Sequence, residues 1–320
     1  MKNRNLIAVA IASALAFTAI GFSNSNAADP KGNAYGYWNK ARLDSAQPIE
    51  LVVDEKTGVG KIVKLARNSS GGSTTSTTSG SNWTKGGDPL NLTGKIFFNA
   101  GGLTYVCSGA FVNDSITGKA IVQTAGHCAW DQAGKAFVTN FVFIPAYQAN
   151  QNVSCAVTPD ACFIGETIFV RDDFANQTSF NSVALSNDWA YVVVNKDAPG
   201  SFPVSFSNSY ASGNVSSFGY PAATPYTGQL LISCSNPIFK DSKNANRTWG
   251  MSCNMTGGAS GGPWLYPWNS TLNTGTLFSL NSYKYNTDKS RMYGPMFNQG
   301  TADTYSSANS GVALTGVRAG

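Results

Sequence analysis

From Gly94 onward the sequence is divided into short runs of Val, Ile, Phe and Tyr, separated by Gly, Pro, Asn and Asp. Runs of four or five such residues fit β-strands and are too short for a helix with a buried face. We find no long amphipathic helical pattern here. The pattern therefore predicts an all-β protein, with room in about 227 residues for one large or two smaller units and a boundary near Asp197 to Gly200.

The first residues, 1–27, are typical of a secretory signal peptide. Lys2 and Arg4 precede an apolar run from Leu6 to about Phe22, and small residues follow it. The run is short for a membrane span, although an uncleaved anchor is the alternative. We expect a secreted, extracellular protein with no stable membrane association.

Residues 28–93 differ in composition from the rest and are expected to form a pro-segment. Within them the Ser/Thr/Gly run 69–81 has too few apolar residues to fold and predicts a flexible linker. We expect a precursor that is cut between Arg67 and Gly94. Of the 22 basic and 17 acidic residues, ten basic and six acidic precede Gly94, so the remainder is nearly neutral. This balance gives no reason to expect a nucleic-acid partner.

The six cysteines are expected to form disulfides, because export places them in an oxidising compartment. Pairing of sequence neighbours is the simplest of about fifteen possible connectivities. A zinc site would need ligand spacings that the chain lacks, and there is one histidine. We expect no metal or cofactor. The cysteines are Cys107, Cys128, Cys155, Cys162, Cys234 and Cys253.

The stretch from Thr256 to Trp264 places Ser260 among four glycines. Glycines tolerate backbone angles that other residues avoid, so the cluster suggests a loop bent to present one hydroxyl and its neighbouring N–H groups. A serine nucleophile with an oxyanion hole requires such a loop, together with a base and a group that orients the base. The alternative is an ordinary Gly/Ser turn.

Two further residues complete a candidate catalytic set. His127, the one histidine, follows an apolar strand and precedes Cys128, which can fasten it to Cys107. Asp188 stands directly before the apolar run Trp189 to Val194 and is the acid best placed for burial. A structural histidine and a strand-capping acid are the alternatives.

In the order His, Asp, Ser, the motifs Thr-Ala-Gly-His-Cys, Asp-Trp-Ala and Gly-Ala-Ser-Gly-Gly-Pro resemble those of the trypsin-like (chymotrypsin-fold) serine proteases. The resemblance is closest to the secreted glutamyl endopeptidase (V8-like) branch. It implies two six-stranded antiparallel β-barrels, an N-terminal one over 94–198 and a C-terminal one over 199–320, with the active site in the cleft between them.

The resemblance also implies a role for each candidate residue. His127 would be the general base, Asp188 would orient it, and Ser260 would be the acylated nucleophile, with the N–H groups of Gly258 and Ser260 as the oxyanion hole. Ala259 stands where members activated by a buried amino terminus carry an aspartate, so that switch cannot operate in its usual form. Substrate-binding residues by resemblance are Asn254, Asn281, Ser282 and Tyr283.

The resulting hypothesis is a secreted, monomeric serine endopeptidase acting on proteins or peptides. By the same resemblance, Asn254 would lie at the base of the first pocket and Asn281 on its wall; neither carries a charge, which favours an uncharged residue before the scissile bond. A G-x-S-x-G elbow would instead make the protein an esterase or lipase, but that class places its histidine after the serine. An inert protease-like binding or adhesion protein is the non-enzymatic alternative.

Overall fold

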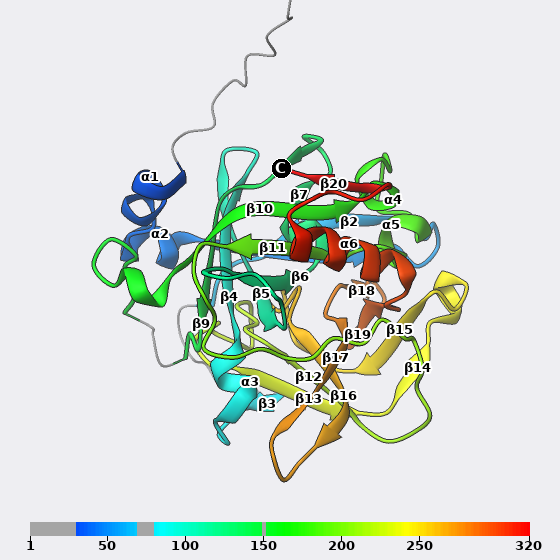
Figure 1. Cartoon of the computed structure of the whole chain (residues 1–320). Helices are drawn as coiled ribbons and strands as arrows, with labels where there is room; N and C mark the ends of the chain where they lie inside the picture. The colour runs from blue at the N-terminus through cyan, green and yellow to red at the C-terminus, as the bar shows by residue number, and fades with distance from the viewer. Residues whose placement is uncertain (1–29, 69–79, 149–151) are drawn as a thin grey trace, which may run out of the picture.

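The computed structural model describes residues 30–68, 80–148 and 152–320 (Figure 1). The predicted signal peptide and most of the predicted linker lie outside these residues. The expected all-β class is confirmed, because strands make up most of the regular structure. No helix among the described residues is long and apolar enough to cross a membrane.

Six antiparallel strands of the first half close into a barrel, in the order β5-β4-β9-β10-β11-β6 with β6 returning to β5. Its buried core includes the edge-to-face rings of Phe111, Phe143 and Phe163. These strands are β4 (Thr93–Ala100), β5 (Leu103–Val112), β6 (Ala120–Thr124), β9 (Thr139–Pro145), β10 (Phe163–Arg171) and β11 (Ala190–Val194).

The second half supplies the strands of the other barrel in two groups, β17-β16-β12-β13 and β14-β15-β19-β18. A hydrogen bond of 2.8 Å from Ser279 Oγ to Pro295 O and the Cys234–Cys253 disulfide connect the two groups. Met251, Trp264 and Phe278 belong to the core between them. The strands are β12 (Val215–Gly219), β13 (Ile232–Asn236), β14 (Ile238–Lys240), β15 (Thr248–Ser252), β16 (Pro263–Asn269), β17 (Thr274–Leu280), β18 (Tyr283–Tyr285) and β19 (Asp288–Pro295).

Much of the range expected to be a pro-segment is packed against the barrels. It forms α1 (Pro30–Tyr37), α2 (Lys40–Ser45), β1 (Gln47–Val53), β2 (Gly60–Lys64), β3 (Ser81–Asn82) and α3 (Gly87–Leu92). Strand β1 lies between β18 and β5 and so joins the two halves in one sheet. Strand β3 pairs with β13, and the neighbouring Trp83 packs on Phe218 and Trp268.

The C-terminus returns to the first barrel, where α6 (Gln299–Ser310) and β20 (Val317–Ala319) lie beside β10 and β11 (Figure 1). This 12-residue helix was not predicted, because the sequence shows no amphipathic helical pattern here. Helix α6 begins with a capping box between Asn298 and Thr301, but its buried side chains are small or hydroxylated. It therefore lacks the apolar stripe by which a helix is found in a sequence.

Short elements complete the chain between these strands. They are η1 (Gly126–Cys128), β7 (Trp130–Asp131), β8 (Ala136–Phe137), η2 (Pro159–Ala161), α4 (Asp172–Ala175), α5 (Ser182–Ser186) and η3 (Ser242–Asn244). The three disulfides join sequence neighbours, Cys107–Cys128, Cys155–Cys162 and Cys234–Cys253, as the simplest pairing predicted.

Candidate active site

Ser260 lies in the loop between β15 and β16, and this loop needs its glycines. Gly258 has φ +97° and Gly261 has φ +83°, values that side chains rarely adopt. A Cβ on Gly261 would collide with Thr124 and Ala125, and one on Gly258 would lie 2.9 Å from Tyr220 O. The loop is therefore pressed against the end of β6, directly before η1.

His127 lies in η1, and the next residue, Cys128, fastens this segment to the rest of the site. Cys128 is bonded to Cys107 on β5, and its Sγ lies 3.9 Å from the carbonyl oxygen of Ser260. The histidine is 4% exposed, and its Nε2 has no hydrogen-bond partner among the described residues. A buried ring nitrogen without a partner, in a segment packed on the Ser260 loop, is available to accept a proton.

Asp188 is fully buried and accepts three hydrogen bonds. Its Oδ1 accepts the backbone N–H of His127 at 2.8 Å, and its Oδ2 lies 2.8 Å from His127 Nδ1. The Ser282 hydroxyl donates to the same Oδ2 at 2.5 Å. The carboxylate therefore fixes the position of both the backbone and the ring of His127, and it favours the tautomer with the proton on Nδ1.

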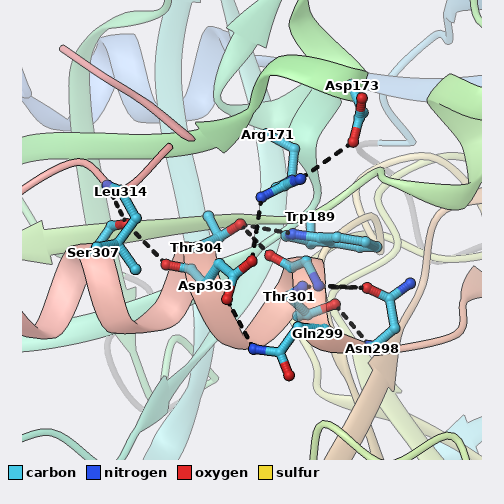
Figure 2. A network of polar contacts seen from close by, with 11 residues as sticks. Arg171, Asp173, Trp189, Asn298, Gln299, Thr301, Asp303, Thr304, Ser307 and Leu314 are labelled. Carbon is cyan, nitrogen blue, oxygen red and sulfur yellow. Dashed lines mark hydrogen bonds and ion pairs between the residues drawn. The ribbon is translucent and has the colours of Figure 1, made fainter. Parts of the chain in front are cut away.

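The strand end after Asp188 is supported from outside the barrel by α6, and Figure 2 shows Trp189 beside Thr304 of this helix. The next residue, Trp189, is fully buried, packs on Phe297 and donates its indole N–H to Thr304 Oγ1 at 3.2 Å. The same helix is tied to β10 by an ion pair of 3.6 Å between Asp303 and Arg171. The C-terminal helix thus holds the strand end that carries the acid.

The candidate oxyanion loop is formed in this structure. The Gly258 N–H donates to the carbonyl oxygen of Ile49 at 3.1 Å, and the Gly258 carbonyl accepts from Ser108 Oγ at 2.8 Å. Ser108 Oγ in turn accepts the Tyr220 N–H at 2.9 Å. Sequence reasoning did not select Ser108, although it directly follows Cys107; its partners lie more than 100 residues away and only the fold reveals them.

The residues expected to bind substrate have their side chains engaged within the protein. The Asn281 amide accepts from Ser217 and Trp264 and donates to the Phe218 and Ala259 carbonyls, all within 2.8 to 3.1 Å. The Ser282 hydroxyl contacts Asp188, so it positions the acid.

The two other expected substrate-binding residues are held in separate contacts. Asn254 Oδ1 accepts from Tyr226 Oη at 2.6 Å and from the Gly80 N–H at 3.1 Å. Tyr283 Oη donates to the buried Asp241 at 2.6 Å. Burial and this carboxylate raise the pKa of Tyr283 well above its ordinary value, which keeps the phenol protonated.

Cys107, His127 and Cys128 bring three potential metal-ligand atoms close together. Both sulfurs are consumed by the disulfide, so they offer no thiolate to a metal. The chemistry available at this site is that of an oriented imidazole, a serine hydroxyl and backbone N–H donors.

Comparisons with known proteins identify the family of this fold. No family model and no curated protein matches the sequence. Among solved structures, the protease Anisep from Arthrobacter nicotinovorans is 36% identical with a TM-score of 0.59, over 70% of this chain and 97% of that one. The thermostable serine protease AL20 from an extremophilic microorganism is 31% identical with a TM-score of 0.59, over 69% and 98%.

A Glu endopeptidase is similar in fold, with 13% identity and a TM-score of 0.54 over 73% of this chain and 98% of that one. At this identity the likeness concerns the fold alone, so the glutamyl endopeptidase branch is only loosely supported. The two-barrel architecture and the two relatives above 30% identity give the same answer: the chain belongs to the chymotrypsin-fold serine proteases.

Proposed function

We propose that this protein is a secreted serine endopeptidase that acts through Ser260, His127 and Asp188. The observation that carries the proposal is the 2.8 Å contact between His127 Nδ1 and the fully buried Asp188, in a chain of a serine protease family. A carboxylate in this position holds the neutral imidazole in the tautomer with its proton on Nδ1 and stabilises the imidazolium that forms when Nε2 takes a proton.

The reaction has two halves. Ser260 Oγ attacks the peptide carbonyl carbon while His127 Nε2 takes the hydroxyl proton, and the carbonyl oxygen becomes an oxyanion bound by the Gly258 and Ser260 N–H groups. His127 then gives its proton to the leaving amine as the C–N bond breaks, which leaves an acyl-enzyme. Water, deprotonated by His127, hydrolyses the ester and restores Ser260.

The proposed substrates are proteins or peptides with an uncharged residue before the scissile bond, cut by a monomeric enzyme. Asn254 supports this preference because its side chain carries no charge. Lys284 is 2% exposed, and its ammonium donates to the Lys289 carbonyl at 2.8 Å, so it is not a free cation at the surface. Cleavage of a peptide library would contradict the preference if Glu, Arg or Lys dominated at that position.

An extracellular location and a maturation step complete the proposal. The three disulfides support export, because oxidising compartments preserve such bonds. We place the maturation cut before Gly80, because the Gly80 N–H bonds to Asn254 and Trp83 is buried against the second barrel. A cut after Gly80 would remove the first contact from Asn254, a candidate pocket residue.

The direct test is labelling and turnover of the processed protein. A fluorophosphonate probe should label the parent protein and not Ser260→Ala, and peptide hydrolysis should fall by about 10⁶-fold in Ser260→Ala. Ser201→Ala is the matched control, because Ser201 is exposed and lies in another loop. Labelling without hydrolysis of any peptide would favour the esterase alternative, and absence of labelling would favour the inert one.

A further inference from the structure

Strand β1 crosses the cleft in which the proposed substrate would bind. Its first two residues pair with Tyr105 and Val106 on β5, and its last three pair with Tyr283 to Tyr285 on β18, both in parallel orientation. The two partner strands belong to different halves of the molecule and flank the Ser260 loop. A strand that belongs to neither barrel therefore fills the edge-to-edge gap between them.

The carbonyl group of Ile49 is bound by one of the two proposed oxyanion donors. It accepts the Gly258 N–H at 3.1 Å, and a Cβ on Gly257 would lie only 2.8 Å from the same oxygen. Ser260 and His127 are 5% and 4% exposed. The proposed oxyanion donor is thus already used, and the nucleophile and base are covered.

The loop around Ser260 already has its bent conformation while the hairpin lies in the cleft. Gly258 already has φ +97°, and Ser108 already holds its carbonyl. Ala259 is fully buried in the core of the second barrel. Since the loop is built before any cut, inhibition of the uncut chain would have to come from what lies in the cleft.

Strand β1 is half of a hairpin with β2, and the turn of this hairpin is fastened to the second barrel. The Asn286 N–H donates to the Val53 carbonyl at 2.9 Å, and its side chain donates to Asp54 at 2.9 Å. Glu55 forms an ion pair of 2.8 Å with Lys243. These contacts of the turn add to the pairing of β1 with β5 and β18 in holding the hairpin in place.

The hairpin also encloses space beside His127. A cavity of about 530 Å³ lies there, with walls from Ile49 and Ile62 of the hairpin and from Trp130 and Phe180 of the rest of the chain. The Gly60 N–H closes one end by donating to the Phe180 carbonyl at 2.8 Å. The hairpin therefore covers a largely apolar cleft.

The direction of β1 protects it from cleavage. The residues before Ile49 pair with β5 next to Cys107, and the Cys107–Cys128 disulfide places them on the His127 side of the cleft. The residues after Ile49 pair with β18. If the Ile49 carbonyl were attacked, the leaving amine of Glu50 would lie on the β18 side. His127 would then be poorly placed to protonate that amine, as expulsion requires.

We infer that the hairpin Gln47–Lys64 is an intramolecular ligand of the catalytic cleft, which binds parallel to β18 with the Ile49 carbonyl in the oxyanion hole and keeps the uncut protein inactive. This inference rests on the proposed function. While the hairpin is tethered to the barrels, its effective concentration at the cleft is near millimolar. Once the tether is cut, the hairpin can dissociate, and dilution lowers the fraction that stays bound.

The experiment uses the full chain with a recognition sequence for an unrelated, selective protease inserted between Asn68 and Gly80. Uncut protein should hydrolyse a peptide substrate at least about 100-fold more slowly than cut protein at high dilution. Activity per molecule of cut protein should rise on dilution and fall when the released segment is added back, and the segment should stay intact. Equal rates before and after the cut would overturn the inference.

Two variants of the hairpin test the contact itself. Leu51→Asp places a charge at a fully buried position of β1 and should activate the uncut protein at least tenfold. Val59→Asp is the matched control, because Val59 is 41% exposed in the turn of the same hairpin, and it should leave the uncut protein inactive. If Leu51→Asp fails to fold, the dilution series of the parent protein decides the question.

The two levels of proposal fail in different ways. Cut and diluted protein without fluorophosphonate labelling or peptide hydrolysis would refute the proposed function. Cut protein that is active, beside uncut protein that is equally active, would refute only the inhibitory role of the hairpin.

Discussion

Ser282→Ala tests whether the third hydrogen bond on Asp188 contributes to catalysis. The Ser282 hydroxyl donates at 2.5 Å to Asp188 Oδ2, the oxygen that also faces His127 Nδ1. Hydrogen bonds to charged groups contribute about 1.5 to 3 kcal/mol. The Asp188 side chain is 0% exposed, so bulk water cannot readily replace the lost donor. If most of this loss affects the orientation of the imidazole, kcat should fall about 10- to 100-fold.

The assay is steady-state hydrolysis of one peptide by processed protein, together with the free energy of unfolding. Ser217→Ala is the matched control, because Ser217 is also fully buried but donates at 2.8 Å to the neutral Asn281 amide, which keeps Trp264 as a second donor. Both variants should lose about 1 kcal/mol or more of stability, whereas only Ser282→Ala should lose kcat, with KM unchanged. A kcat within twofold of the parent in Ser282→Ala would refute the reasoning.

Two further predictions concern the oxyanion loop and the hairpin. Gly258→Ala should lower kcat by about 10²- to 10³-fold, because φ +97° and the Tyr220 carbonyl 2.9 Å from the new Cβ force the N–H donor to move; unchanged kcat in a folded variant would contradict this. Burial raises the pKa of Glu50 in the docked hairpin, and Lys284 and Lys289 only partly oppose this. The protonated Glu50 carboxyl therefore stabilises the docked hairpin at pH values below the pKa that Glu50 has in the released hairpin. This stabilisation is lost as the pH rises through the higher pKa that Glu50 has in the docked hairpin. The activity ratio of uncut to cut protein should therefore rise with pH over this range, and Glu50→Gln should abolish the rise; the same slope in both proteins would exclude Glu50.

The sequence by itself determined the fold class and the small set of candidate catalytic residues, whereas neighbour pairing of the cysteines was only the simplest of about fifteen connectivities until the structure showed it. Short runs of β-forming residues are local patterns, and a few consecutive residues are enough to recognise each one. Likewise, one histidine, one serine among glycines and one acid before an apolar strand leave few alternatives. Each of these signals is contained in a stretch of about ten residues.

The tertiary structure decided which side chains meet. Ser282 lies 94 residues from Asp188, and Ile49 more than 200 residues from Gly258, so no local pattern records either contact. Helix α6 escaped notice because its buried face is made of Thr, Ser and Ala, and capping and packing stabilise it without an apolar stripe. The hairpin is the clearest case: the composition of residues 28–93 marks them as different, but their place in the cleft follows from unpaired strand edges on both barrels, which exist only once the barrels have formed.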